Sequence, residues 1–199
     1  EQLIKGSPQG RRKFLDIMLS QIDPLYVRYL FRYYRSMKQR NVLLKERNFS
    51  LIAPFENQMA QSGAYIISKR ELLVSYLQPY CQQYHTKLSG SEEIFTLTYK
   101  PCLNMEDKDL QSKQQQLLEV FSKDREREAL FGSTLKGPHK DELAFVIDEQ
   151  EAKYFSSQGQ KRCCLASLRL AQWHHLKDQV GEIPLLLIDD FGTSLDPNR

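Results

Sequence analysis

The stretch "FSSQGQKRCCLASLRLAQWHHLKDQVGEIPLLLIDD", Phe155 to Asp190, decides the fold that the sequence predicts. A polar turn around Gly159 leads into an amphipathic helix that is expected to pack against a core. A run of aliphatic residues, 185–188, then predicts a strand buried on both faces. The strand ends in Asp189 and Asp190. This order of turn, helix, strand and acids predicts an α/β architecture, in which ligands bind at the carboxyl ends of strands.

The turn allows two interpretations. The start of a helix presents backbone N–H groups and the positive end of the helix dipole, to which Ser157 and Gln160 would add polar side chains. Such a turn can bind phosphate. The alternative is an ordinary capped turn, in which Ser157 caps the helix and Gly159 relieves strain. The chain has no G-x-x-x-x-G-K-[ST] loop, so any phosphate site would be incomplete.

The two acids at the end of the expected strand also leave two interpretations open. Side chains alternate along a strand, so Asp189 and Asp190 should point in different directions. One carboxylate could hold Mg²⁺, and the other could orient or activate water for attack on a phosphoryl group. The alternative is a strand end at which both acids face solvent.

The rest of the chain predicts helices first and mixed elements later. We expect a helical lobe over 1–90, joined to a lobe of strands and helices over 91–199. Pro54 is expected to break a helix, and Pro79 allows a kink in the long helix that follows. The expected elements are helices from Pro8, from Asp23-Pro24, over 63–88 and over 106–131 with Gly132 as its cap, and strands within 93–100 and 137–149.

Positive charge gathers at the beginning of the chain. Residues 1–50 contain eleven Lys or Arg and four Asp or Glu, which suggests an anionic partner. Helical spacing puts Arg28, Arg32 and Arg35 on one face, and they are candidates for contact with DNA phosphates, as are Arg11 and Arg12. A solvated helix face, or ion pairs within the protein, explain these arginines equally well. The tyrosines on the opposite face predict core packing rather than base stacking.

Composition excludes several classes of function. The four cysteines lack C-x-x-C spacing and predict free thiols, and the four histidines form no metal-binding pattern. No apolar run is long enough to span a bilayer, and no leader peptide is recognisable, so we expect no membrane partner. The chain opens on "EQ" without an initiator Met, which predicts a piece of a longer protein.

The combination of turn, helix and acidic strand resembles the ABC ATPases, with the turn as signature sequence, the acids as Walker B and "TSLD" as D-loop. More specifically, the whole chain resembles the RecF family of bacterial DNA replication and repair proteins. The segments that carry this resemblance follow the family order: "GSPQGRRKFLD", "MKQRNVLLK", "QSGAYIISKR", "GPHKDEL" and "FSSQGQKR". Four positions depart from the family pattern, namely Phe55, Lys140 and the D-loop pair Thr193-Ser194.

The resemblance implies roles for individual residues. The signature residues Ser157, Gln158, Gly159 and Gln160 would contact ATP held by a partner subunit, so this site exists only in an ATP-dependent homodimer. Their donors should therefore face water in the chain by itself. Asp189 would assist Mg²⁺ binding, and Asp190 would act as general base or orient the water. The D-loop would contribute Ser194 and Asp196.

The resemblance also implies a function: ATP-gated dimerisation on DNA, at single-strand gaps and stalled forks, with RecO and RecR as partners in recombinase loading. It implies a protein of the bacterial cytoplasm, associated with the nucleoid, and a slow DNA-dependent ATPase. The family's Walker A loop and Q-loop lie upstream of Glu1, so we predict no turnover by the 199-residue chain. A non-catalytic ATP-switched scaffold, or another ABC or SMC-type ATPase head, stays open as an alternative.

Overall fold

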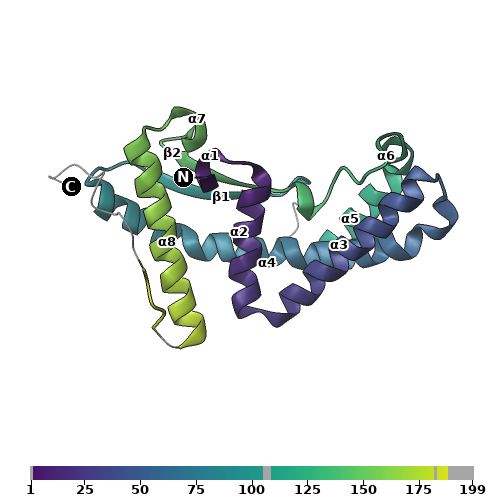
Figure 1. Cartoon of the computed structure of the whole chain (residues 1–199), viewed down its shortest axis with the longest axis horizontal. Helices are drawn as coiled ribbons and strands as arrows, with labels where there is room; N and C mark the ends of the chain where they lie inside the picture. The colour runs from purple at the N-terminus through teal and green to yellow at the C-terminus, as the bar shows by residue number, and fades with distance from the viewer. Residues whose placement is uncertain (1, 105–108, 182, 188–199) are drawn as a thin grey trace. The chain divides into compact units, whose positions relative to one another are not determined.

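The structure, a computed structural model, describes residues 2–104, 109–181 and 183–187. These residues are mostly helical and carry one small sheet, so the expected mixture of helices and strands is present with helices dominating (Figure 1). The chain forms two compact units, each assembled from separate segments. Unit 1 comprises Glu1–Met18, Leu72–Lys100 and Leu143–Arg199, and unit 2 comprises Leu19–Glu71 and Pro101–Glu142. The units therefore do not coincide with the predicted lobes 1–90 and 91–199.

Unit 1 is built around the sheet. Its strands follow the order β1-β2-β3, and β2 pairs antiparallel with β3, with Val146 opposite Glu151 and Ile147 opposite Gln150. Asp148 and Glu149 form the turn between them with positive φ angles of 46° and 68°, as the tightest hairpins require. The elements of this unit are α1 (Gln2–Lys5), most of α2 (Pro8–Ile22), the second half of α4 (Ala53–Ser89), β1 (Phe95–Lys100), β2 (Glu142–Ile147), β3 (Gln150–Glu151), α7 (Ala152–Phe155) and α8 (Gln158–Val180).

Glutamines of α4 satisfy backbone groups of β1, which is the first strand in the sheet order. Gln82 Oε1 accepts from the backbone N–H of Phe95 at 2.6 Å, and Gln78 Nε2 donates to the Phe95 carbonyl at 3.0 Å. Gln78 Oε1 also accepts from the N–H of Leu97. An unpaired strand edge exposes such groups to other chains, so α4 both covers and completes this edge.

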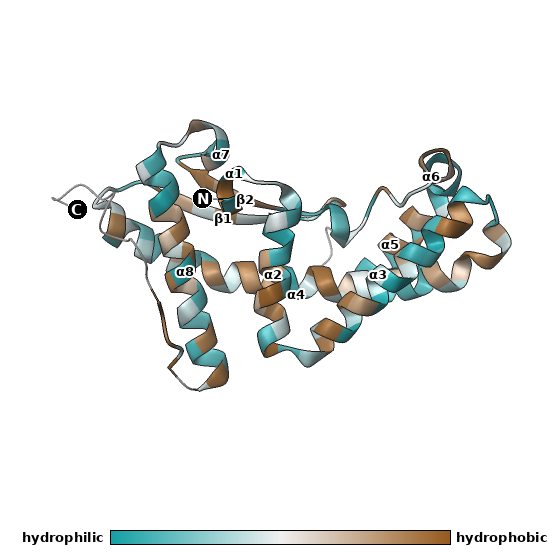
Figure 2. Cartoon of the chain, viewed as in Figure 1, coloured by the Kyte–Doolittle hydropathy of each residue, from teal (hydrophilic) through white to brown (hydrophobic). Residues whose placement is uncertain are grey.

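The core of unit 1 lies between the sheet and its helices. Phe95 of β1 and Phe145 of β2 stack with ring centroids 6.3 Å apart, and both are buried. Helix α8 contributes buried Cys163, Cys164 and Leu168. Figure 2 shows hydrophobic and hydrophilic segments alternating along the helices, α8 included, as expected of helices with one apolar side. The alternation of "EIFTLTYK" therefore predicted β1 correctly.

Unit 2 consists of helices whose ends are fixed by local capping. Asp23 caps α3 by accepting from the N–H groups of Leu25 and Tyr26, at 2.9 and 3.1 Å, and Pro24 occupies the first turn. Gly132 ends α6 in the left-handed conformation, as expected. The elements are α3 (Pro24–Lys45), the short 3-10 helix Phe49–Leu51, the first half of α4, α5 (Leu110–Lys123), α6 (Arg125–Phe131) and the 3-10 turn Pro138–Lys140.

Three expectations about single elements were wrong. Helix α4 begins at Ala53, so Pro54 lies in its first turn, where a missing N–H costs nothing, and does not break it. The expected helix 106–131 is two helices in its described part, α5 and α6, which meet at Asp124. Residues 183–187 form no strand, and Leu185 and Leu187 are each 85% exposed. A strand buried on both faces needs hydrogen-bonded neighbours, and the described sheet contains only β1 to β3.

No helix within the described ranges is long and apolar enough to cross a membrane. All four cysteines are free thiols, as the sequence predicted.

Candidate functional site

The turn before α8 is a complete capping box. Ser157 is the N-cap, and its Oγ accepts from the backbone N–H of Gln160 at 3.2 Å. The Gln160 side chain reciprocates, because its Oε1 accepts from the Ser157 N–H at 2.7 Å. The capped-turn interpretation is therefore correct for the local geometry. Gly159 lies inside the first turn of the helix, and its φ is not in the left-handed region, so it relieves no backbone strain.

A second layer of contacts holds this turn. Gln160 Nε2 donates to Glu93 Oε1 at 2.9 Å, and the other carboxylate oxygen of Glu93 lies 3.3 Å from His85 Nε2. Burial alone raises the pKa of the Glu93 carboxyl. Its hydrogen bonds, of which the one from Gln160 is the largest, outweigh burial and lower the pKa overall. Lys5 Nζ donates to Gln158 Oε1 at 3.0 Å.

The expectation that the donors of the turn face water is therefore correct only in part. Ser157 and Gln158 are exposed, and the backbone N–H groups of Gln158 and Gly159 have no acceptor among the described residues. The side-chain amide of Gln160, by contrast, is bonded within the chain through both its oxygen and its nitrogen. A Cβ placed on Gly159 would meet only Ser157 Oγ, at 3.9 Å, so packing within the chain does not require glycine there.

The other sequence-predicted residues of the nucleotide site, namely Asp189, Asp190, Ser194 and Asp196, lie outside the described residues. Among the described residues no group of three or more His, Cys, Asp or Glu side chains could hold a metal ion.

Arg11 is a correction to the predicted DNA contacts. Its side chain is only 5% exposed, and its Nη1 donates to the carbonyls of Ile4 and Gly6 at 3.2 and 2.9 Å. These carbonyls belong to the end of α1, so the guanidinium completes a helix terminus. Arg11 therefore has a structural role. Its neighbour Arg12 is partly buried.

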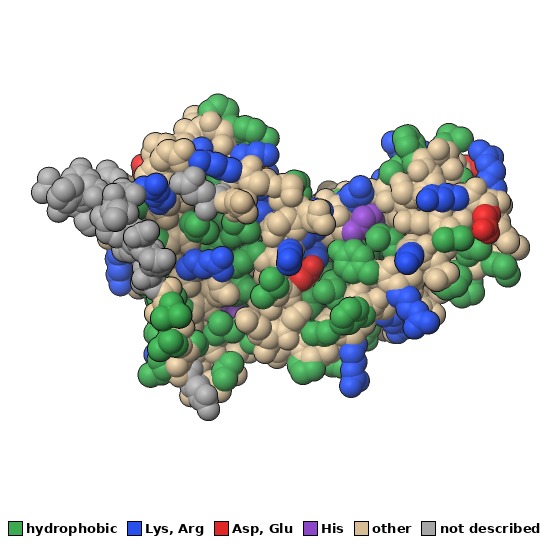
Figure 3. Space-filling model, in the orientation of Figure 1, with side chains coloured by type: hydrophobic (Ala, Val, Ile, Leu, Met, Phe, Trp, Pro, Cys, Tyr) green, Lys and Arg blue, Asp and Glu red, His purple; other side chains and the backbone are tan. Residues whose placement is uncertain are grey.

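The arginine face of α3, defined as Arg28, Arg32 and Arg35, is exposed as predicted. None of the three has an ion-pair or hydrogen-bond partner within the described residues. The opposite side of α3 carries Tyr26 and Tyr33, which are completely buried, so these two tyrosines belong to the core as expected, whereas Tyr34 is 37% exposed. Figure 3 shows Lys and Arg side chains along α3 with hydrophobic side chains between them.

Two of these arginines line a pocket of about 660 Å³ between α3 and the start of α4, which we call the arginine pocket. Phe31, at its rim, is 73% exposed. Ser36 Oγ donates to Gln58 Oε1 across the pocket at 2.9 Å. The lining residues are Phe31, Arg32, Arg35, Ser36, Gln39, Phe55 and Gln58.

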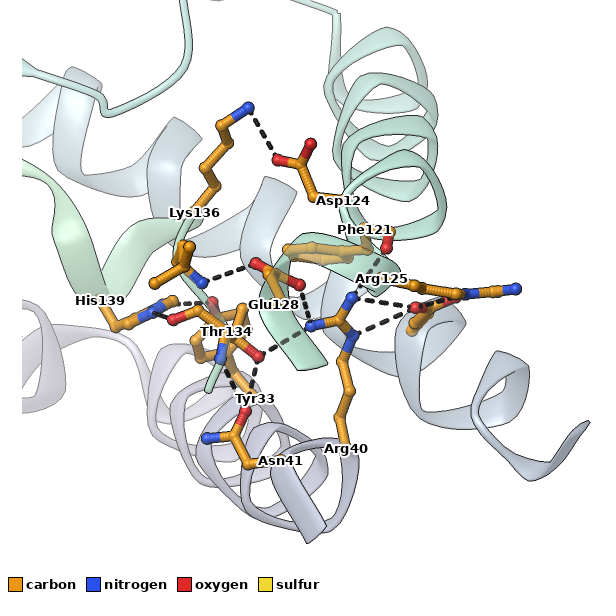
Figure 4. Close-up of polar contacts among 12 residues, drawn as sticks. Tyr33, Arg40, Asn41, Phe121, Asp124, Arg125, Glu128, Thr134, Lys136 and His139 are labelled. Atoms are coloured by element: carbon orange, nitrogen blue, oxygen red, sulfur yellow. Dashed lines mark hydrogen bonds and ion pairs between the residues drawn. The ribbon is translucent and has the colours of Figure 1, made fainter. Parts of the chain in front are cut away.

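Sequence reasoning missed a buried charge cluster that joins α3, α4 and α6 (Figure 4). Arg40 is fully buried and pairs with Glu56 at 3.0 Å and Glu128 at 2.5 Å. Its Nη2 also donates to the Phe121 carbonyl at 2.7 Å. Arg125 pairs with the remaining oxygen of Glu56, so two cations meet two carboxylates. The signal was present in the sequence, because Arg40 continues the buried series Tyr26, Tyr33 at a spacing of seven residues.

A second buried set links α3 and α4 to the loop before β2. Arg70 donates to the hydroxyl of Tyr26 at 3.1 Å and to the Pro138 carbonyl at 2.8 Å. His139 Nε2 donates to the Thr134 carbonyl at 3.0 Å, so its Nδ1 accepts from the Tyr33 hydroxyl at 2.7 Å. Arg70 comes from "ISKR", and Pro138 and His139 come from "GPHKDEL", so these members of the two segments serve the core of unit 2.

Comparison with known proteins supports the resemblance that the motifs suggested. No family model matches the chain. The DNA replication and repair protein RecF of Protochlamydia amoebophila is 44% identical over 199 residues, which cover 100% of this chain and 55% of that protein. RecF of Gloeothece citriformis is 36% identical, with 99% of this chain and 56% of that protein covered.

Solved structures agree. The recombination mediator protein RecF-ATPrS in the RecFOR pathway matches with a TM-score of 0.90 at 29% identity, over 99% of this chain and 54% of that chain. RecF-ATP of the same pathway also gives 0.90, at 30% identity. The chain is therefore a homologue of the DNA replication and repair protein RecF, and it spans about 55% of the length of the relatives it matches.

Proposed function

We propose that the chain is the signature-bearing part of a RecF-like DNA-repair ATPase, which binds DNA and uses ATP to close a homodimer. The observation that carries this proposal is the match of 99% of the chain to RecF-ATP with a TM-score of 0.90. A match at that level extends over the helical elements and the signature turn alike. The whole protein would act in the bacterial cytoplasm at the nucleoid, with RecO and RecR as partners at gaps and stalled forks.

The signature turn would bind the γ-phosphate of ATP held by the second subunit. The N–H groups of Gln158 and Gly159, which have no acceptor among the described residues, and Ser157 at a helix N-terminus are suited to an anion. The space left at Gly159 would admit a close approach from outside the chain. Because Gln160 is already bonded to Glu93, its part would be to hold the turn. ATP bound between subunits favours the dimer by mass action.

The residues outside the described ranges complete this proposal. Asp189 would help to hold Mg²⁺, Asp190 would orient or activate the attacking water, and Ser194 and Asp196 would belong to the D-loop. Asp190→Asn in the whole protein separates hydrolysis from scaffolding. If this variant turns over no ATP but still supports repair at the wild-type level, the chain belongs to an ATP-switched scaffold.

The dimer proposal is tested at Gly159. Gly159→Arg in the whole protein has room for its side chain and should keep the fold and the melting temperature. It should abolish ATP-dependent dimerisation, measured by light scattering with and without ATP. Gly10→Arg, at another helical glycine with open space around it, is the matched control. Normal dimerisation by Gly159→Arg would contradict a role for the turn in the interface.

The arginine face of α3 would contact DNA phosphates. Each phosphate neutralised by a cation lowers the slope of log affinity against log salt by about 0.9 for duplex DNA. Changing Arg28, Arg32 and Arg35 together to Ala should weaken binding and flatten that slope. The control removes three exposed charges elsewhere, with Lys87, Lys123 and Arg127 changed to Ala. Equal slopes for the arginine variant and the wild type would refute the contact.

A further inference from the structure

We propose that the arginine pocket takes one unpaired nucleotide of DNA, with the base on the ring of Phe31 and the phosphate on Arg32 and Arg35. This rests on the proposed DNA contact of α3 and deepens it, because phosphate contact alone needs charges but no pocket and no aromatic ring. Three features of the pocket favour this ligand, namely its charge, its aromatic surface and its amide groups.

The charge of the pocket is uncompensated. Arg40 and Arg125, in the buried charge cluster of the same unit, are matched by Glu56 and Glu128. Arg32 and Arg35 have no carboxylate partner in the part of the chain that the structure describes. The pocket lining contains no Asp or Glu. An anion is therefore the ligand that this surface complements, and a planar guanidinium suits phosphate.

The aromatic surface of the pocket is open. Phe31 is 73% exposed, although a ring of this size usually buries its faces. Elsewhere on the same helix Tyr29 stacks on Tyr65 at 4.3 Å, whereas neither Phe31 nor Phe55 stacks on another ring among the described residues. An exposed phenyl face next to two guanidinium groups is the combination that binds single-stranded nucleic acid, because every base has a face that can stack.

The amides of the pocket suit the edge of a base. Ser36 holds Gln58 by its Oε1, and the Nε2 group of Gln58 has no acceptor among the described residues. Gln39 adds a second, exposed amide. A base edge presents donors and acceptors that amides can match. The volume of about 660 Å³ lies within the range of small-ligand pockets and accommodates a nucleotide. An acidic peptide with an aromatic residue is the other ligand that these charges and rings could bind. It would not need the amides of Gln39 and Gln58, so the pocket favours a nucleotide.

The test uses the whole protein and compares single-stranded oligo(dT), an abasic strand of equal length and a blunt duplex. Phe31→Leu keeps every charge, and because Phe31 is so exposed its melting temperature should not change. We expect it to weaken oligo(dT) binding about 5- to 150-fold, the loss of one stacked base, while duplex and abasic binding stay unchanged. Phe31→Tyr keeps an aromatic ring and should bind oligo(dT) as tightly as the wild type does. Phe131→Leu, 64% exposed on α6, is the matched control.

The outcomes distinguish this inference from the proposed function. An unchanged affinity for oligo(dT), or an equal loss on all three DNAs, would overturn the nucleotide pocket. If that happens while the arginine variant still flattens the salt slope, α3 contacts phosphates only and the proposed function stands. If neither variant alters DNA binding, both ideas fail. Loss of binding to an acidic aromatic peptide by Phe31→Leu, without loss on DNA, would assign the pocket to protein docking.

Discussion

Glu93 fixes the orientation of the Gln160 amide, because the carboxylate accepts from Nε2 at 2.9 Å while Oε1 of the same amide accepts from the Ser157 N–H at 2.7 Å. A free glutamine amide could turn over and exchange its donor and acceptor. With Glu93 in place, only one orientation satisfies both contacts. The loop before β1 thus holds the start of α8, and the order of the signature turn depends on a residue far from it in the sequence.

The first prediction concerns this link. Glu93→Ala should release the Gln160 amide and loosen the capping box, at a cost near that of losing a helix cap, about 1 kcal/mol. Hydrogen exchange at the Ser157 N–H, whose acceptor is Gln160, should become faster. Glu92→Ala, an exposed neighbouring carboxylate, should change neither quantity. Unaltered exchange at Ser157 in the Glu93 variant would mean that the cap forms without Glu93.

A second prediction concerns the cap itself. Ser157→Ala removes the oxygen that accepts from the Gln160 N–H and should cost about 1 kcal/mol of unfolding free energy, measured by urea denaturation. Ser157→Asp should retain most of that stability, because an acid also caps a helix and favours its positive end. Ser156→Ala, one position before the cap, is the control. If the Ala and Asp variants lose the same free energy of unfolding, the capping oxygen at position 157 does not supply this stability.

The third prediction concerns the buried cluster of unit 2. Arg40→Met leaves Glu128 without its cation and Glu56 with only Arg125, and breaking a buried pair on one side costs about 3–5 kcal/mol. Chemical denaturation should register the loss. Lys38→Met, which removes an exposed charge from the same helix, should have almost no effect. Adding Glu128→Gln to Arg40→Met should recover stability, whereas a further loss would argue against charge as the cause.

The fourth prediction concerns pH. His175 is buried on α8 beside the ring of Tyr76, neither of its ring nitrogens has a partner among the described residues, and burial lowers its pKa. The unfolded state therefore binds the proton more readily, so stability is present above the unfolded pKa of about 6.5 and falls as the pH drops below it. The slope is at most about 1.4 kcal/mol per pH unit.

His175→Phe keeps a ring against Tyr76 but cannot titrate, so its stability should be flat between about pH 5 and pH 7. The wild type should lose stability over the same range in thermal melts. Asp23 and Glu93, whose pKa values are lowered, change the stability only at more acidic pH, below about pH 5. His174→Phe, which removes the neighbouring ring that contacts Tyr84, is the control for the substitution itself. If the stability of the wild type and of His175→Phe changes with pH in the same way, His175 is not the source of the pH dependence.

Features that depend on neighbours in the sequence were predictable. Asp23-Pro24 predicted the start of α3, Gly132 predicted the end of α6, and alternation predicted β1. Each of these depends on residues within one turn or one strand. The exposed arginine face followed from helical spacing in the same way.

Features that depend on distant partners were not predictable. Arg11 has the same local character as Arg12, yet three carbonyls of the preceding segment bury it. The burial of Arg40 requires Glu128, which lies 88 positions later in the chain. The aliphatic run after Gly181 has the composition of a buried strand, but composition does not supply the strands that must pair with it. The arginine pocket could not be predicted either, because it is lined by residues of two helices, α3 and α4.

Neither unit is a continuous piece of the chain, and this constrains how the protein is made and how it can change. Cleavage at the Gly90–Ser91 turn would divide both units and would take Glu128 away from Arg40. During synthesis unit 2 has to wait for α6, and unit 1 has to wait for α8, so neither is finished before the ribosome is well past the middle of the chain. Such late, distant contacts make folding slower than in proteins with local contacts. A single crossover between genes cannot exchange either unit whole, because the segments of each unit are separated by segments of the other.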